Sequence, residues 1–223
     1  MLEVIPIRLS VANCYLLKTG TGYVLVDTGF SWHRHALHRA LEDARCNPGD
    51  IKLVVITHGD MDHTGNCVWL RKRYGAPVAM HGAEVRAVER GNMFLSRKSR
   101  PNPIVRALAP VAARLFSPRF TPQVLLNDGD NLSAYGLDAK VLHLPGHSLG
   151  SIGVLTAEGQ FFCGDLLTTR DGKPVKGELV DDAAQMDASI ERIKSLPIEM
   201  LYPGHGRPFA MAELTQASRG PGQ

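Results

Sequence analysis

The sequence predicts an α/β fold in one domain. Short runs of β-branched and aliphatic residues alternate with longer segments of helical periodicity, and residues 53–56 are typical of a strand buried on both faces. The chain has 223 residues, of which 44% are hydrophobic and 21% charged, enough to bury one substantial core. We therefore expect one domain over residues 1–217 and a disordered tail over 218–223.

Strands alternate with helices through the first half of the chain. The pattern predicts strands over 3–9, 13–18 and 23–27, with a hairpin turn at 19–22. Ser31 is placed to cap a helix over 32–45, which ends before Pro48 and Gly49. After the strand at 53–56 we expect a short helix over 66–73, a strand over 77–80 and a helix over 83–90.

The second half repeats this alternation more loosely. Strands are predicted over 123–126, 137–144, 151–156 and 160–164, and an irregular loop begins at 171–174. A helix over 182–195 ends before Pro197, and a strand over 199–202 and a short helix over 210–217 follow.

Composition limits the classes of function. The net charge of +3 does not indicate a nucleic-acid partner, and no apolar run approaches the length of a membrane span. The N-terminal residues lack the pattern of a signal peptide, and the four cysteines have no CxxC spacing. We expect a cytoplasmic protein with reduced, buried thiols and a small-molecule substrate. The sequence does not indicate an oligomeric state.

Ligand-type side chains follow several of the predicted strands. His58, Asp60, Asp62 and His63 come directly after the strand at 53–56. Charged and imidazole groups at the edge of a core are costly unless something pairs them, and a metal cation is the expected partner. If the loop is extended, His58, Asp60 and Asp62 point to one side and His63 to another. Further candidates stand after later strands, each beside a glycine: His147, Asp165 and His205.

This set of motifs resembles the metallo-β-lactamase superfamily from about residue 11 to residue 206. The resemblance implies a four-layer αββα sandwich with a metal site at one edge, and it implies two divalent ions, with Zn expected and Mn or Fe as alternatives. One site would take His58, His147 and the residue at position 60, and the other would take Asp62, His63 and His205. Asp165 would bridge both ions, and Asp27 would orient the loop of the main motif.

The chain departs from the family pattern at position 60. The family motif is His-x-His-x-Asp-His, whereas here the second histidine is Asp60. A carboxylate is a harder and more anionic ligand than imidazole, and it shifts the preference toward Mn or Fe. The departure therefore bears on whether the first site fills and with which metal.

The segment from 91 to 122 is expected to be a basic amphipathic insertion. It holds six basic residues and no acidic one, and its apolar residues fall at helical spacing between prolines. One interpretation is a lid whose Arg97, Lys98 and Arg100 attract an anionic or amphiphilic substrate. Alternatives are an inserted segment that packs on the domain with its arginines in solvent, and a segment that contacts a membrane surface. His81 follows a strand and is either a pocket residue or a turn cap.

The hypothesis from these residues is a metal-dependent hydrolase. A hydroxide held by two cations would attack an ester, thioester, lactone or phosphoester, and Asp62 would position it as well as bind metal. The departure at position 60 argues against hydrolysis of β-lactams. An iron-dependent redox enzyme and a non-catalytic, metal-free binding protein are the alternatives.

Overall fold

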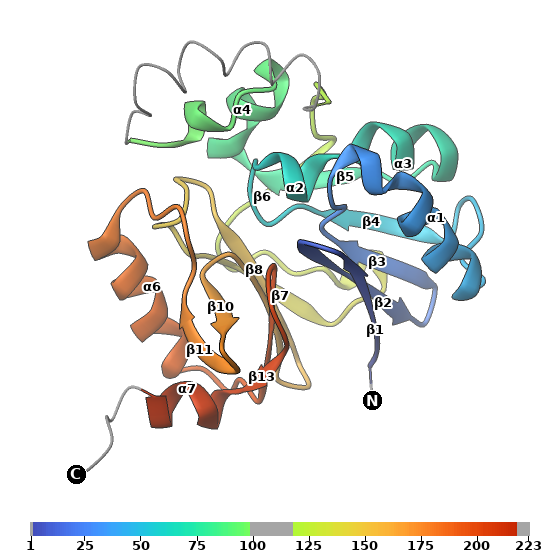
Figure 1. Ribbon diagram of the computed structural model, residues 1–223. Coiled ribbons are helices and arrows are strands. Elements are labelled where there is room, and N and C mark those ends of the chain that lie inside the picture. The colour runs from blue at the N-terminus through green and yellow to red at the C-terminus, as the bar shows by residue number, and fades with distance from the viewer. Residues whose placement is uncertain (1, 99–117, 218–223) are drawn as a thin grey trace.

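The computed structural model describes residues 2–98 and 118–217 and contains two β-sheets packed face to face (Figure 1). Within the described residues, the first sheet has six strands in the order β1-β2-β3-β4-β5-β6. Strands β1 to β3 are antiparallel, and β3 to β6 are parallel. The strands are β1 (Glu3–Leu9), β2 (Ala12–Thr19), β3 (Gly22–Val26), β4 (Ile51–Val55), β5 (Val78–His81) and β6 (Val124–Leu126).

The second sheet is formed by the later half of the chain. Its order is β13-β12-β9-β8-β7 among the residues described, and β9 and β12 run parallel. A separate hairpin, β10–β11, lies beside this sheet. The strands are β7 (Ala139–His143), β8 (Ile152–Thr156), β9 (Gln160–Gly164), β10 (Leu167–Arg170), β11 (Lys173–Lys176), β12 (Met200–Pro203) and β13 (Phe209–Ala210).

Helices cover the outer faces of both sheets. Helices α1 (Arg34–Asp43) and α3 (Cys67–Tyr74) lie on the first sheet, and α6 (Ala183–Lys194) and α7 (Met211–Ala217) lie beside the second (Figure 1). The shorter helical segments are η1 (Ser31–His33), α2 (Met61–Thr64), η2 (Gly82–Glu84), α4 (Val85–Arg90), η3 (Met93–Ser96) and η4 (Ser133–Tyr135).

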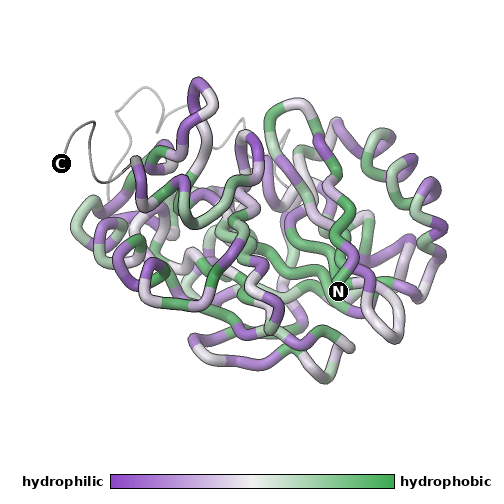
Figure 2. The backbone as a smooth tube through the Cα atoms, turned by 90° about the horizontal axis from the view of Figure 1, so that it is seen from below, coloured by the Kyte–Doolittle hydropathy of each residue, from purple (hydrophilic) through white to green (hydrophobic). Residues whose placement is uncertain are grey.

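Three buried clusters separate the four layers. Alternation along β3 and β4 explains the first two, because Leu25 and Val54 pack under α1 and α3 while Val24 and Val55 face the second sheet. The third cluster joins the outer face of the second sheet to α6 and α7. Figure 2 shows the hydrophobic segments along the central strands and the hydrophilic ones along peripheral turns and helices. The predicted αββα sandwich is confirmed.

The strand ends bring the ligand-type residues to one edge of the sandwich. Parallel strands present their carboxyl ends at the same edge, and loops there carry binding residues. The parallel strand β4 ends just before His58. In the second sheet β9 ends before Asp165 and its parallel neighbour β12 ends before His205.

The region after β9 corrects one prediction. The expected irregular loop at 171–174 is the turn of the β10–β11 hairpin. Asp171 and Gly172 have φ angles of 50° and 75°, which is the backbone of a two-residue turn that matches strand twist. An Asp-Gly pair is a sequence signal for such a turn. Ala210, predicted to be helical, ends the short strand β13.

Part of the basic insertion lies outside the described residues. Residues 99–117, which include Arg100 and most of the predicted amphipathic segment, are in this part, and so is the tail at 218–223. The lid, the tail and the single-domain boundary therefore stay predictions. Among the described residues, no helix has both the length and the hydrophobicity needed to cross a membrane.

Candidate metal centre

The loop after β4 supplies ligands in two directions. Asp60 is the N-cap of the helical turn α2, which begins at Met61, so the expected extended loop ends at Asp60. Successive residues of a helix are rotated by about 100°. Asp62 and His63 therefore turn toward a different group of side chains from His58, and the prediction that His58, Asp60 and Asp62 share one side was wrong for Asp62.

The first group lies deep in the cluster. His58, His147 and Asp165 hold ligand atoms within 4.8 Å of one another. Asp60 Oδ2 lies 3.3 Å from His147 Nε2 and 3.7 Å from His58 Nε2. The side chains of His58, Asp60 and His147 are at most 4% exposed. The structure thus brings together the residues that the resemblance assigns to the first site.

The second group is nearer to solvent. Asp62, His63 and His205 form it. His205 Nε2 lies 3.2 Å from Asp62 Oδ2, and His63 Nε2 lies 3.6 Å from the same oxygen. The side chains of His205 and Asp62 are 28% and 18% exposed, so any reactant would reach this group first.

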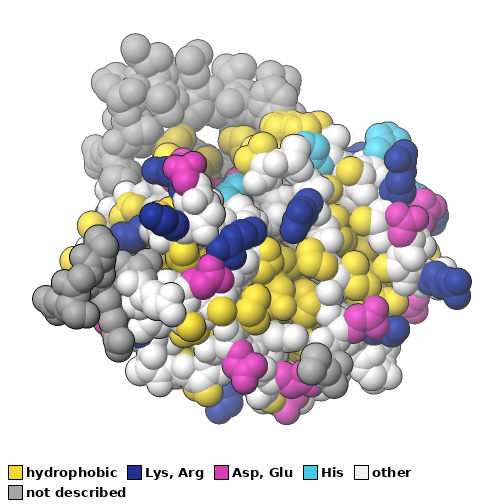
Figure 3. All heavy atoms as spheres, turned by 60° about the horizontal axis from the view of Figure 1, so that its bottom comes forward, with side chains coloured by type: hydrophobic (Ala, Val, Ile, Leu, Met, Phe, Trp, Pro, Cys, Tyr) yellow, Lys and Arg dark blue, Asp and Glu magenta, His cyan; other side chains and the backbone are white. Residues whose placement is uncertain are grey.

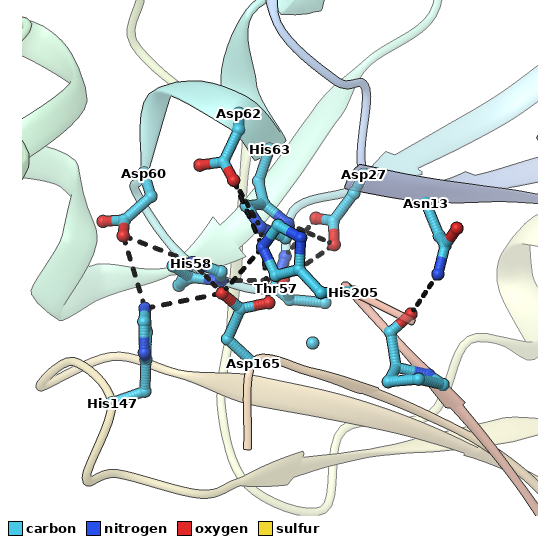
Figure 4. Close-up of polar contacts among 12 residues, drawn as sticks. Asn13, Asp27, Thr57, His58, Asp60, Asp62, His63, His147, Asp165 and His205 are labelled. Atoms are coloured by element: carbon cyan, nitrogen blue, oxygen red, sulfur yellow. Dashed lines mark hydrogen bonds and ion pairs between the residues drawn. The ribbon is translucent and has the colours of Figure 1, made fainter. Parts of the chain in front are cut away.

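Asp165 lies between the two groups (Figure 4). Its carboxylate oxygens are 3.2 to 3.9 Å from the Nε2 atoms of four histidines: His58, His63, His147 and His205. Ligand atoms around a tetrahedral ion with bonds of roughly 2.0–2.2 Å are separated by roughly 3.3–3.6 Å. The observed separations are therefore close to those that a pair of metal sites sharing Asp165 requires.

The Nδ1 atom of each of the four imidazoles has a partner outside the cluster. His147 Nδ1 lies 2.8 Å from the carbonyl oxygen of Glu178, and His205 Nδ1 lies 2.7 Å from that of Val11. A carbonyl only accepts, so Nδ1 carries the hydrogen in both rings. The lone pair of the neutral ring is then on Nε2, which faces the cluster.

Asp27 and Thr57 fix the other two rings. Asp27 accepts hydrogen bonds from the Thr57 N–H and Thr57 O–H, at 2.9 and 2.8 Å, and lies 2.9 Å from His63 Nδ1. Because the Thr57 hydroxyl donates to Asp27, it accepts from His58 Nδ1 at 3.0 Å. Asp27 also has a φ of 58°, the strained backbone often found at functional sites.

The cluster has the features of a metal centre. His58 Nε2, His63 Nε2 and Asp165 Oδ1 are buried and accept or donate no hydrogen bond within the described residues. Orphaned buried polar atoms are costly, and a cation is the partner that neutral imidazole and carboxylate share. The residues present therefore fit two divalent ions.

Electrostatics favour a cation here. Burial lowers the pKa of His63, but the carboxylates of Asp165, Asp62 and Asp27 outweigh burial and raise it to about 10. For His205, burial is outweighed by hydrogen bonds to Asp165 and Asp62, and its pKa rises to about 11. Burial raises the pKa of Asp165, yet the nearby imidazoles hold it well below its ordinary range. Without a metal, His63 and His205 thus hold protons at the positions that a metal ion would occupy.

Sequence reasoning missed Glu84. Its buried carboxylate accepts hydrogen bonds from the N–H groups of Gly59 and Gly150, at 2.9 and 2.8 Å, and from the Ser148 hydroxyl at 2.8 Å. It thereby joins the loop of His58 to the loop of His147. Only an acid within a predicted helix was visible in the sequence, so no local signal marked it.

The predicted substrate-binding residues that the structure describes, His81, Arg97 and Lys98, have partners of their own and do not line the cavity that opens onto the cluster. His81 caps η2 through its Nδ1 and stacks on His143, with ring centroids 4.2 Å apart. Lys98 forms an ion pair with Asp182 at 2.8 Å. Arg97 is buried against Asp60, and Arg100 lies outside the described residues. His81 thus has the geometry of the turn cap.

The four cysteines, Cys14, Cys46, Cys67 and Cys163, are free and buried. Burial raises the pKa of the Cys163 thiol to about 12, and it also raises that of Cys67. A thiolate is the reactive form, so these thiols are inert at neutral pH. The expectation of buried, unpaired thiols is confirmed.

A cavity of about 560 Å³ opens onto the cluster. Asp62, Asp165 and His205 are among its lining residues, together with apolar side chains that include Val11, Phe30, Met61, Met93 and Leu179. Val11 and Leu179 are 57% and 68% exposed. The mouth of the cavity therefore offers apolar surface to a ligand whose polar end reaches the cluster.

Fold and site together define a four-layer sandwich with two adjoining candidate metal sites at one edge. Residues 7–205 match the family model of the metallo-beta-lactamase superfamily, and the chain belongs to this superfamily. It is 29% identical over 221 residues to acyl-coenzyme A thioesterase MBLAC2 of Bos taurus, covering 91% of this chain and 76% of that protein.

Two further similarities extend this result. The chain is 28% identical over 168 residues to hydroxyacylglutathione hydrolase GloC of Haemophilus influenzae, covering 74% and 71% of the two chains. It also superposes on the crystal structure of TTHA1623 in a di-iron-bound form with a TM-score of 0.69 and 26% identity, covering 96% of this chain and 97% of the other.

Proposed function

We propose that this protein is a metal-dependent hydrolase of thioesters that carry an apolar acyl group. The observation that carries the proposal is the joined cluster of four imidazoles and three carboxylates at the floor of an apolar-rimmed cavity. Two of the similar proteins are named as a thioesterase and a hydroxyacylglutathione hydrolase, and both names describe cleavage of a thioester.

The groups that line the cavity favour a thioester over an oxygen ester or a phosphoester. Among the described residues that line it, none is a lysine, arginine, tyrosine or cysteine. A thiol leaving group has a pKa of roughly 8.5, so it departs with little help from a protonated acid. A phosphoester, by contrast, brings negative charge to the reacting centre, and the described lining offers no lysine or arginine to pair with it.

The exposed aromatic and aliphatic groups beside the cluster suit the acyl part of the substrate. Phe30 lines the cavity and stacks on Trp32, with ring centroids 4.1 Å apart, and Trp32 is 53% exposed. Figure 3 shows hydrophobic side chains gathered on one face, bordered by acidic and basic side chains of both signs. The modest net charge of +3 supports a small-molecule substrate rather than a nucleic acid.

The chemistry is divided between the ions and the chain. Divalent ions held here would supply Lewis acidity and would lower the pKa of water enough to make it a nucleophile near neutral pH. Asp62, which lines the cavity, would orient the attacking water, and its Oδ2 lies 3.2 Å from His205 Nε2. Asp27 and Thr57 hold two imidazoles in the tautomer that leaves Nε2 free. The apolar rim holds the acyl group over the cluster.

The test is thiol release from a panel of thioesters by protein loaded with Zn, Mn or Fe. The panel holds acyl-coenzyme A of increasing chain length, a hydroxyacylglutathione and an oxygen ester of the same acyl group. We expect thioesters to be cleaved and the oxygen ester to be cleaved far more slowly. Equal rates on both esters, or hydrolysis of phosphodiesters alone, would contradict the proposal.

Asp62→Ala is the variant that tests the assignment of the site. Loss of its carboxylate would remove a candidate ligand of the second group and the group that orients water, so we expect kcat to fall by about 10²–10³-fold. Asp187→Ala, an exposed acid on α6, is the control and should retain full activity. Full activity in Asp62→Ala would rule out this cluster as the active site.

Metal identity separates this proposal from the iron-dependent redox alternative. The di-iron form of TTHA1623 shows that a protein of this fold and 26% identity holds iron, so iron is a specific second candidate. Elemental mass spectrometry on protein purified without chelators identifies the ion. Iron together with oxidation of a reduced donor, and no thioester cleavage, would favour the redox enzyme.

A further inference from the structure

Arg97 forms the closest ion pair of the first group. Its two terminal nitrogens donate to the two oxygens of Asp60, each at 2.8 Å, in a parallel bidentate pair. Both side chains are 4% exposed. Such an arrangement is the strongest form of the arginine–carboxylate interaction, and it is largely shielded from solvent.

The same guanidinium also contacts a candidate ligand. One terminal nitrogen of Arg97 lies 3.1 Å from His147 Nε2. The Nδ1 hydrogen of His147 is directed to the Glu178 carbonyl, so Nε2 holds the lone pair that faces Arg97. Arg97 therefore contacts both Asp60 and His147, and a cation in the first group would need the same two partners.

Hydrogen bonds hold the backbone on both sides of Arg97, so they fix the position from which Arg97 contacts Asp60 and His147. Asn92 caps η3, the Ser96 carbonyl accepts from the Leu149 N–H at 2.9 Å, and the Lys98 N–H donates to Asp181 at 2.8 Å. The partners Leu149 and Asp181 stand close to His147 in the fold, since the Asp181 N–H bonds to the Gly146 carbonyl. The segment that carries Arg97 is thus attached to the His147 loop on both sides of the arginine.

Charge explains why an arginine stands here. A carboxylate at position 60 adds one negative charge to a buried group in which the histidine of the family motif would add none. Arg97 adds one positive charge at hydrogen-bond distance, so the Asp60–Arg97 pair is neutral, as an imidazole is. The pair thus has the same net charge as the neutral histidine that the family motif places here. It differs in that the histidine would offer a lone pair to a metal ion, whereas Arg97 places a fixed positive charge on Asp60.

We propose that Arg97 is a resident cation of the first site that competes with a metal ion for Asp60 and His147, so that the second site fills first and the first site binds metal weakly. Arg97 is a positioning residue, because it acts through Asp60 and does not line the cavity. The inference rests on the proposed metal centre and not on the thioesterase activity.

The experiment measures metal binding without activity. Metal-free protein, Arg97→Met and the control Lys98→Met are titrated with Zn²⁺ and Mn²⁺ by isothermal calorimetry, and bound metal is counted after dialysis. For the native chain we expect one tight equivalent and a second at least 100-fold weaker. Arg97→Met retains the length of the side chain without its charge, and we expect its second equivalent to tighten at least tenfold. Lys98→Met removes the neighbouring charge, which pairs with Asp182, and should leave both equivalents unchanged.

A double-mutant cycle separates charge from a merely structural role. Asp60→His in the native background leaves the guanidinium buried without its carboxylate, so the first site should bind more weakly still. Asp60→His with Arg97→Met removes the cation and should give two tight equivalents. If Arg97 only supported the loop, Arg97→Met would weaken the first site in both backgrounds, and Arg97→Lys, which retains the charge, would behave like Arg97→Met.

The outcomes distinguish the two proposals. Tight binding at the second site with no gain from Arg97→Met, or two equally tight equivalents in the native chain, would overturn the inference and leave the proposed function intact. No metal binding by native protein would overturn both. Circular dichroism of each metal-free variant checks that the fold is retained, and Arg97→Gln supplies the uncharged comparison if Arg97→Met does not fold.

Discussion

At the scale of single residues, the site depends on a few carboxylates that each accept several hydrogen bonds. An asparagine in the same place could accept fewer, because only one of its two terminal atoms is an acceptor. Asp27 lies near three donors: the N–H and O–H groups of Thr57 and the Nδ1 of His63. These bonds hold Asp27 in a left-handed backbone conformation that costs most residues about 1–2 kcal/mol. The strain is retained because the hydrogen bonds set the orientation of two imidazoles.

Asp27→Asn tests this orientation. Asparagine tolerates the same backbone conformation. Its NH2 group cannot accept a hydrogen bond, so at least one of the bonds from Thr57 or His63 is lost. We expect the unfolding free energy of the metal-free protein to fall by about 1–3 kcal/mol and metal affinity to fall roughly 10–100-fold. Urea denaturation and competition with a chromophoric chelator measure these values. The exposed Asp43→Asn is the control, and unchanged affinity in Asp27→Asn would show that Asp27 does not orient a ligand.

At the scale of elements, the β10–β11 hairpin holds the last ligand loop in place. The Thr168 hydroxyl donates to the carbonyl oxygen of His205 at 2.9 Å, and the Thr169 hydroxyl accepts from the Arg207 N–H at 2.7 Å. From the other side, Asn13 donates to the carbonyl oxygens of Pro203 and Gly206, at 3.0 and 2.8 Å. The position of His205 therefore depends on elements from both halves of the chain, β2 and the β10–β11 hairpin.

Gly172→Ala weakens the hairpin through its backbone alone. A Cβ at Gly172 meets no atom within 4 Å, but its φ of 75° is costly for alanine, by about 1–2 kcal/mol. We expect faster amide exchange over residues 167–176 and a larger loss of metal affinity at the second site than at the first. Gly20→Ala, also in open space and without a positive φ, should show neither effect. Equal weakening of both sites would mean that the hairpin acts on the fold as a whole.

At the scale of the whole molecule, the cluster couples metal binding to protons. The pKa values of His63 and His205 are raised to about 10 and about 11, so both are protonated near neutral pH in the metal-free protein. Since a metal needs the free Nε2, each ion displaces protons. A raised pKa also stabilises the metal-free fold at low pH, and this contribution is lost as pH rises from the ordinary 6.5 through about 10.

Metal affinity should therefore increase with pH. Between pH 6.5 and 8.5 we expect the logarithm of the second-site affinity to rise by up to about two per pH unit, one for each protonated imidazole. Over the same range the metal-free protein should lose unfolding free energy. Calorimetry in buffers of different ionisation enthalpy counts the released protons. Affinity that does not change with pH would show that both imidazoles are already neutral.

The candidate ligands could be located in the sequence because local rules place them at strand ends. His58, His147, Asp165 and His205 each follow a short apolar strand, and glycine allows the turn beside it. The Asp-Gly pair at 171–172 carried an equally local signal for the hairpin. The Asp60–Arg97 pair had none, because its residues are 37 positions apart and meet only through the tertiary fold. Glu84 was invisible for the same reason, since its partners belong to two distant loops.

Asp165 and the four imidazoles around it come from both sheets of the sandwich, so the cluster reports on how the halves assemble. His58 and His63 belong to the half that ends with β6, whereas His147, Asp165 and His205 belong to the half that begins with β7. Neither half alone can encircle an ion with this set. The visible absorption of Co²⁺ bound by the full set would therefore appear only when the two sheets have docked, and it would time this docking step without any label attached to the chain.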